Sequence, residues 1–148
     1  MKKIIFFLTF IITTNIGKTQ SSNLFILNDI INDCLNNCLS ETNISTLLID
    51  YYPFSFEFSD SIKSRQLNYV SIKNQRYYKY LKKGQKVLFF DGLSLDSNKL
   101  IIQFSGRFVK YEGKKHIVIA ISDWFNFIYE YSCDKKQWIF IKKNVGGI

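Results

Sequence analysis

Apolar and polar residues alternate along the last third of the chain, and this alternation predicts three consecutive antiparallel strands over residues 99–143. Turn-like segments at residues 112–115 and 133–137 divide the run into strands joined by two hairpins. Pairing outward from the turns places Leu100 opposite Phe127. Because successive side chains of a strand point to opposite faces of the sheet, one face then collects nine apolar residues: Leu100, Ile102, Phe104, Phe125, Phe127, Tyr129, Tyr131, Ile139 and Ile141. We expect this face to form the core.

The same pairing predicts where the sheet bends. It places Tyr129 opposite Ile141 on the second pair of strands and Ser122 opposite Ser105 on the first. Ser122 and Gly106, which follows Ser105, interrupt the apolar pattern at the same level of two neighbouring strands. A β-bulge or a glycine kink is typical of such a position, so we expect a sharply bent sheet.

The segment that follows Ser21–Asn23 has a helical period instead. Its apolar residues recur every three or four positions, which is the spacing of one face of an α-helix: Leu27, Ile30, Ile31, Cys34, Leu35 and Cys38. Ser21–Asn23 offer N-cap side chains directly before this run. Asparagine fills much of the other face and is a poor helix former, so we expect the helix to depend on packing against the sheet. The predicted fold class is α+β, with an N-terminal amphipathic helix packed on a bent antiparallel meander of about five to six strands.

Shorter segments lie between the helix and the long strands. The pattern predicts strands at residues 45–52 and 54–58, on either side of the only proline, Pro53, and another at 66–73. Residues 74–83 suit a short helix ended by Gly84, although a strand also fits their tyrosines. A short strand at 86–90 and a turn-rich loop at 91–98 complete the expected order.

Residues 1–20 have the pattern of a secretory signal peptide. Lys2 and Lys3 precede nine apolar residues, Ile4–Ile12, and a polar stretch follows. Gly17 and Thr19 are small residues that favour cleavage after Thr19. We therefore expect a single α+β domain over residues 21–148, located outside the cell or in the periplasm, with no transmembrane segment after cleavage; an N-terminal membrane anchor is the alternative.

Removal of this segment changes the charge of the chain. The segment contains Lys2, Lys3 and Lys18 and no acidic residue, so the formal net charge falls from +8 to +5. That value is ordinary for a soluble domain, and export makes a nucleic acid an unsuitable partner. Aromatic residues make up 17% of the chain, and most of these rings must be buried in one sizeable core.

Three cysteines in an exported chain allow one disulfide and leave one thiol over. Cys34 and Cys38 are one helical turn apart, so a bridge between them would close almost no loop. A bridge from Cys133 to Cys34 or to Cys38 would instead tie the helix to the sheet. The alternative is that all three are reduced and behave as small buried hydrophobic residues.

The sequence contains no motif that predicts catalysis, a metal site or a cofactor. His116 is the only histidine, so histidine-based metal sites and serine triads lack their partners. Residues 83–86 (KGQK) lack the spacing of a phosphate-binding loop. Asp123 and Glu130 fall on opposite faces of one strand and so do not form an acid–base pair. We expect a protein that is not an enzyme and binds no metal or cofactor.

One surface is more apolar than a solvated sheet face should be. The face opposite the predicted core carries the candidate binding residues Ile101, Gln103, Trp124, Ile128, Trp138 and Phe140. Large aromatic patches often mark binding surfaces. The alternative is that residues 45–58 or 74–83 cover this face and make it a second core.

Several segments resemble small exported proteins of uncharacterised function from Bacteroidetes-type bacteria. These are Lys2–Lys3, residues 129–133 (YEYSC), Trp138 and the terminal Gly146–Ile148. The expected order of a helix and then a bent sheet is similar to the cystatin-like and nuclear-transport-factor-2-like folds. The resemblance implies an architecture and no particular activity, because such folds host inhibitors, adaptors and small-ligand enzymes alike.

We therefore expect a secreted or periplasmic, non-enzymatic domain that binds a protein or another macromolecule. One alternative is a small-ligand pocket between the helix and the curved sheet, with or without weak catalytic activity. Another is a structural or oligomerisation module joined through the aromatic face. A closed, polar-lined cavity would favour the pocket, whereas a flat exposed patch of Trp124 and Trp138 would favour the macromolecular partner.

Overall fold

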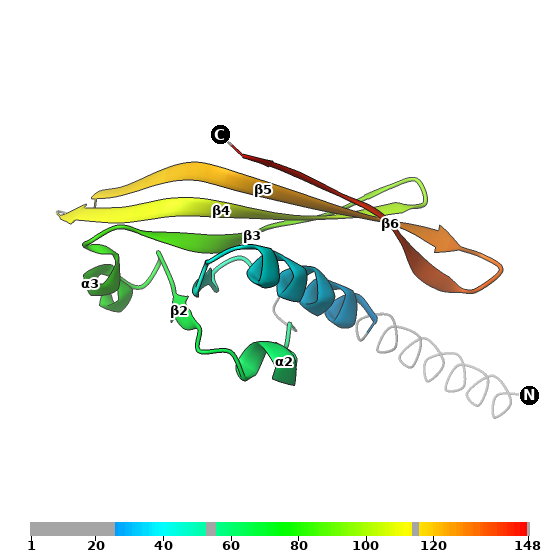
Figure 1. The fold of residues 1–148 in the computed structure, drawn as a ribbon, viewed down its shortest axis with the longest axis horizontal. Coiled ribbons are helices and arrows are strands. Elements are labelled where there is room, and N and C mark those ends of the chain that lie inside the picture. The colour runs from blue at the N-terminus through cyan, green and yellow to red at the C-terminus, as the bar shows by residue number, and fades with distance from the viewer. Residues whose placement is uncertain (1–25, 53–55, 114–115, 148) are drawn as a thin grey trace, which may run out of the picture.

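The computed structural model describes residues 26–52, 56–113 and 116–147 (Figure 1). Residues 26–41 form a long helix. Six strands form one sheet in the order β2-β1-β3-β4-β5-β6, and their bounds are β1 Thr46–Leu48, β2 Asn68–Val70, β3 Gln85–Asp96, β4 Lys99–Gly113, β5 His116–Ser132 and β6 Gln137–Gly147. Three short helical turns are α2 (Asp60–Lys63), η1 (Gln75–Tyr77) and α3 (Tyr78–Leu81). The fold is α+β with a mostly antiparallel sheet, which confirms the predicted class at this level.

The long helix packs its apolar side on the sheet (Figure 1). Its buried residues are Ile31, Cys34, Leu35, Cys38 and Leu39. The predicted signal peptide (residues 1–20) and the N-cap at Ser21–Asn23 lie outside the described residues. Among the described residues, no helix is both long and apolar enough to cross a membrane.

Asparagines on the helix bind the extended segment before α2. Asn28 exchanges two hydrogen bonds with the backbone of Glu57, at 2.9 and 3.0 Å. Asn32, one turn later, donates to the Glu57 carbonyl (2.9 Å) and accepts from the Ser59 amide (2.8 Å). Asparagine disfavours a helix by propensity, but here its amides satisfy the backbone of a segment that has no strand partner. The helix therefore depends on tertiary contacts.

The first two strands are shorter than predicted and run parallel. β1 pairs with β2 and with β3 in parallel, so the expectation of an antiparallel meander throughout was wrong for this end of the sheet. The predicted strand at 45–52 ends at Leu48 because the chain turns at Asp50. The Asp50 carboxylate accepts hydrogen bonds from the Ile72 amide (2.7 Å) and the Lys73 amide (3.3 Å). Residues 56–58, in the predicted strand 54–58, are not in a strand.

β3 extends through the segment expected to be a loop. The register shifts between Phe90 and Gly92, so Asp91 is an extra residue in a β-bulge. Beyond the bulge Leu93 pairs with Ile102, and the strand continues to Asp96. The polar residues that suggested a loop therefore lie in a β-bulge and at the solvent-exposed positions of an edge strand. The predicted alternative of a short helix before Gly84, which has φ +71°, is confirmed by α3.

From Lys99 to Gly106, β4 pairs with β5 two residues away from the predicted register. Leu100 lies opposite Tyr129 and Ile102 lies opposite Phe127. A shift of two residues keeps every side chain on its face, and five of the predicted core residues of these strands are buried: Leu100, Ile102, Phe104, Phe125 and Phe127. Of the other two, Tyr129 is partly buried and Tyr131 is exposed. The predicted bulge is confirmed, because the register shifts after Gly106 and leaves Ser122 without a partner.

From Asp123 to Ile128, β5 and β6 pair in the predicted register, but from Tyr129 to the turn they pair one residue away from it. This difference changes the face of the β6 residues. Tyr129 lies opposite Phe140, not Ile141, and Tyr131 lies opposite Trp138, not Ile139. A second bulge after Ile128 makes Ile141 the extra residue. The observed register places the Tyr129 and Phe140 rings 5.4 Å apart and the Tyr131 and Trp138 rings 5.3 Å apart, both edge to face. Such pairs stabilise by about 0.5–1.5 kcal/mol each.

Two apolar clusters result, one on each face of the sheet. The larger lies between the long helix and the sheet and contains Leu35, Leu47, Leu88 and Phe104 among others. The smaller lies under α3 on the other face and contains Leu48, Val70, Leu81, Val87, Phe89 and Val109. We call the face away from the long helix the outer face. The alternative in which residues 74–83 cover this face thus holds at one end of the outer face, whereas Trp124 is exposed.

Candidate functional site

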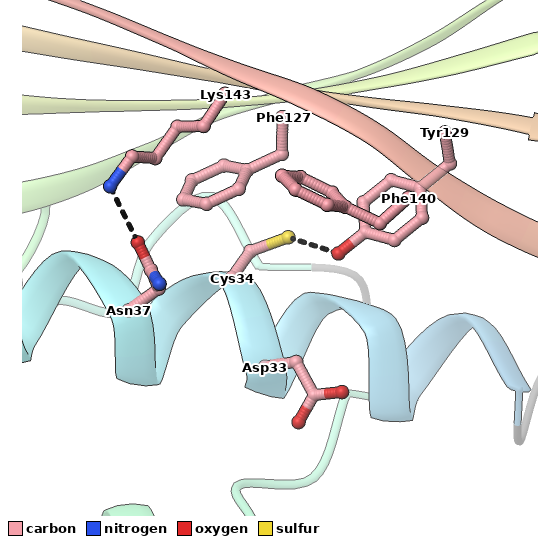
Figure 2. Close-up of a pocket in the computed structure, with 7 residues that line it drawn as sticks. All are labelled: Asp33, Cys34, Asn37, Phe127, Tyr129, Phe140 and Lys143. Carbon is pink, nitrogen blue, oxygen red and sulfur yellow. Dashed lines mark hydrogen bonds between the residues drawn. The ribbon is translucent and has the colours of Figure 1, made fainter.

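A cleft of about 400 Å³ lies between the long helix and the β5–β6 hairpin (Figure 2). We call it the helix–sheet cleft. Seven residues line it: Asp33, Cys34, Asn37, Phe127, Tyr129, Phe140 and Lys143. Its volume is within the range of about 300–1,000 Å³ that is usual for small-molecule sites.

The periods of the helix and the strands explain how these residues meet. Cys34 and Asn37 are three residues apart on the helix, so both point toward the sheet. Phe127 and Tyr129 are two residues apart on β5 and share one face. Phe140 lies opposite Tyr129 across the bulged β5–β6 pair. Three aromatic rings therefore form one wall of the cleft, and the helix forms the other.

A hydrogen bond between a thiol and a phenol crosses the cleft. The Cys34 Sγ lies 3.3 Å from the Tyr129 hydroxyl (Figure 2). Burial raises the pKa of Cys34 from its ordinary 9.0 to about 12, and burial also raises the pKa of Tyr129. Both groups therefore keep their protons near neutral pH. Since the thiolate is the nucleophile of cysteine chemistry, Cys34 can hydrogen-bond to a ligand but is not set up to attack one.

Lys143 joins β6 to the helix at one end of the cleft. Its Nζ donates to the Asn37 side-chain oxygen (2.9 Å) and pairs with the Glu41 carboxylate. The Lys143 charge is therefore already compensated. Figure 2 shows the Asp33 carboxylate pointing away from the aromatic rings. The apolar part of the cleft thus contains no uncompensated charge.

The predicted binding residues divide between the two faces. Ile101, Gln103 and Ile128 lie on the outer face with Trp124, since each alternates with a buried residue of β4 or β5. Trp138 and Phe140 were wrongly placed with them. The bulge at Ile141 shifts β6 by one residue, and a one-residue shift moves a side chain to the opposite face. Phe140 consequently lines the helix–sheet cleft.

Trp124 lies in a shallow hollow of about 210 Å³ on the outer face. Asp91, Gln103 and Asn126 line it together with Trp124 and Phe104. A Cβ on Gly146 would lie 2.4–2.5 Å from three atoms of the Trp124 indole. The ring therefore lies over that glycine, and this position requires a residue without a side chain. Gln103 donates to the Asn126 side-chain oxygen at 3.2 Å. One indole face and several amide groups are therefore presented to solvent.

The three cysteines are free, so neither of the possible bridges from Cys133 to Cys34 or to Cys38 is present. Cys133 is exposed in the β5–β6 turn, whereas Cys34 and Cys38 are buried under the sheet. The described residues also contain no group of three or more histidine, cysteine or acidic side chains that could hold a metal.

Sequence reasoning did not identify the polar residues of the cleft. Asn37 and Lys143 are 106 residues apart, and no local pattern connects them. One residue could have indicated them: Lys143 is a charged residue two positions beyond Ile141, and it therefore lies on the predicted core face. A charge at such a position usually has a buried partner.

Comparison of the chain with protein-family models, with curated proteins and with solved structures found no match.

Proposed function

We propose that this protein is a secreted or periplasmic, non-enzymatic binding domain that takes a small, neutral, aromatic or apolar molecule in the helix–sheet cleft. The observation that carries the proposal is the wall of three rings, Phe127, Tyr129 and Phe140, beside a cavity of about 400 Å³. Ligand sites are concave, mostly apolar and supplied with few polar groups, and this cleft has those properties. For this reason we favour a small-molecule ligand over a macromolecular partner.

The polar groups of the cleft favour a ligand without charge. Lys143 is already paired with Glu41, so an anion would have to compete with that carboxylate. The Cys34 thiol and the Tyr129 hydroxyl hydrogen-bond to each other, and a ligand carbonyl or hydroxyl can exchange with either of them. Both groups stay protonated near neutral pH, which suits recognition better than catalysis.

Replacing Phe140 by serine should weaken binding of the neutral fluorophore N-phenyl-1-naphthylamine at least about 10-fold, because one ring of the wall is removed. Phe140 is 51% exposed, so the loss of its contact with the Tyr129 ring should lower the melting temperature by about a few degrees only. Fluorescence titration of the purified protein measures the affinity. The matched control is Ile141→Ser, since Ile141 is the next residue, is 49% exposed and does not line the cleft. Equal affinities of the Phe140→Ser variant and the wild type would contradict the proposal.

The macromolecular partner remains a second candidate because of Trp124. Its exposed indole and the neighbouring amides line a shallow hollow with both apolar and polar groups, and central aromatic residues often dominate protein interfaces. In the same experiment, Trp124→Ser should leave fluorophore binding unchanged. A protein retained from the native exported fraction by the wild type and by Phe140→Ser, but not by Trp124→Ser, would favour this second candidate.

We also propose that residues 1–20 are removed and that the helix is the first element of the mature domain, beginning close to Ser21–Asn23. The charged start and the nine apolar residues support export. Intact-mass measurement of the protein from its native host should show cleavage between Gly17 and Gln20. A mature protein that still begins at Met1 would contradict export by this route.

A further inference from the structure

The first part of β5 is an open edge of the sheet. β6 pairs with β5 only from Asp123, which lies opposite Gly147. Residues 116–121 pair with β4 on one side, and Ser122 is the extra residue of the bulge. No strand of the described chain pairs with residues 116–122 on the other side. Figure 1 shows β6 ending part of the way along β5, so that the beginning of β5 becomes the outermost strand. We call residues 116–122 the open edge.

Apart from the bulge at Ser122, which lies at its end, the open edge lacks the protection that sheet edges usually have. Its sequence is HIVIAIS, without lysine, acid, proline or glycine. Val118, Ile119 and Ile121 are 37%, 40% and 48% exposed. Natural edge strands are usually blunted by charge, by bulges or by short length, because unpaired backbone groups otherwise recruit another strand.

The other open edges of the described sheet do have such protection. β6 is an edge strand of the sheet and contains Lys142 and Lys143. The free part of β3 contains the Asp91 bulge and ends at Asp96. β2 has only three residues. The open edge is therefore the one long uncharged edge in the described part of the chain.

We propose that two copies of this protein pair antiparallel through their open edges and form one continuous sheet across a two-fold axis. A two-fold interface requires a self-complementary surface, and the open edge is one. With the axis at Ile119, Ile117 lies opposite Ile121 of the second copy and Val118 lies opposite Ala120. The ends of the pair place His116 opposite Ser122, so no like charges face each other.

The faces of the strand agree with this register. Ile117, Ile119 and Ile121 lie opposite Tyr111, Val109 and Arg107 of β4, which places all three on the outer face. Ile117 already packs against the smaller apolar cluster. Since directly opposed residues of antiparallel strands share a face, the isoleucines of both copies would form one apolar ladder that extends this cluster across the axis.

The length of the open edge also selects a second copy as its partner. Gly147 occupies the position opposite Asp123, and the β4–β5 hairpin closes the other end at Gly113 and His116. A partner strand of about seven residues fits between these limits, and the same segment of another copy has that length. Because so short a strand pair buries less than a standard interface, the dimer should be reversible and dependent on concentration.

Analytical ultracentrifugation of the purified protein should show the mass rising from monomer to dimer with concentration. Ile119→Lys should raise the dissociation constant at least about 10-fold, because it opposes two ammonium groups at the axis. Ile141→Lys is the matched control on β6 and should leave dimerisation unchanged. A wild type that is monomeric at every concentration, or that forms open-ended oligomers, would overturn the proposal.

A crosslinking experiment tests the register without relying on the lysine variant. In a Cys133→Ser background, Ile119→Cys should form a disulfide-linked dimer on mild oxidation, because residue 119 faces its own copy at the axis. Ile121→Cys should crosslink at least about 10-fold more slowly, since it faces Ile117. Equal rates for the two variants, or faster crosslinking through residue 121, would overturn the proposed pairing.

Discussion

Replacement of Phe104 by alanine should lower the free energy of unfolding by about 3–5 kcal/mol, as large-to-small changes in a packed core do. Phe104 is 1% exposed at the centre of the face that meets the long helix. Its ring centroid lies 5.4 Å from that of Phe90 and 6.3 Å from that of Phe127. The substitution therefore leaves a cavity bordered by aromatic rings, which cannot easily collapse. Urea denaturation measures the loss, and the melting temperature should fall by more than about 10 °C.

Phe108 provides the matched control on the same strand. It is also a phenylalanine, four residues further along β4, but it is 41% exposed. Phe108→Ala should cost no more than about 1.5 kcal/mol, because much of its ring is already in water. Equal losses for the two variants would show that β4 does not present Phe104 to the core.

The faces of β4 and β5 could be predicted because side chains alternate between the two faces of a strand with a period of two residues. A register error of two residues therefore moves no side chain to the other face. Leu100 and Phe127 were assigned different partners than they have, yet both are buried as expected. The error of one residue at β6 had the opposite consequence. It reversed the faces of Trp138 and Phe140, and with them the composition of the predicted site.

Whether a bulge can be predicted depends on whether it leaves a mark in the sequence. The bulge at Ser122 interrupts the apolar pattern on two adjacent strands, since Gly106 lies at the same level. The bulge at Ile141 has no such mark, because an isoleucine fits a regular strand equally well. The aromatic pairs of Tyr129 and Tyr131 determine that register, and they become visible only once the strands are paired.

The parallel strands and the cleft depend on contacts between distant segments. β1 and β2 have three residues each, which is too short for a period to be recognised. Their ends are positioned by the Asp50 carboxylate through the amides of Ile72 and Lys73. The cleft likewise combines Asn37 of the helix with Lys143 of the last strand. Contacts of this kind follow from the assembled fold and not from local propensity.

Raising the pH from 9 to 11 should destabilise the protein by roughly 5 kcal/mol through its two buried thiols. Burial raises the pKa of Cys34 from 9.0 to about 12 and also raises the pKa of Cys38. Below pH 9 both the folded and the unfolded chain keep these protons, so the thiols do not affect stability. Above pH 9 the unfolded chain releases them while the folded chain retains them, and each thiol then costs about 1.4 kcal/mol per pH unit.

The buried tyrosines should act in the same direction at higher pH. Burial raises the pKa of Tyr52 and of Tyr129 above the ordinary 10.0, so unfolding releases their protons as well once the pH exceeds 10. Urea denaturation at a series of pH values measures the combined slope. Cys38→Ala removes one thiol, and although it lowers stability at every pH, it should reduce the slope between pH 9 and 10 by about half.

Cys133→Ser distinguishes burial from the mere presence of thiols. Cys133 is exposed in the β5–β6 turn, so its replacement removes no buried thiol and should leave the slope unchanged. A slope that disappears in Cys133→Ser, or that persists in full in Cys38→Ala, would contradict the placement of Cys34 and Cys38 under the sheet. Because Cys34 lines the helix–sheet cleft, the same measurement with bound fluorophore should show whether the ligand extends its protection to higher pH.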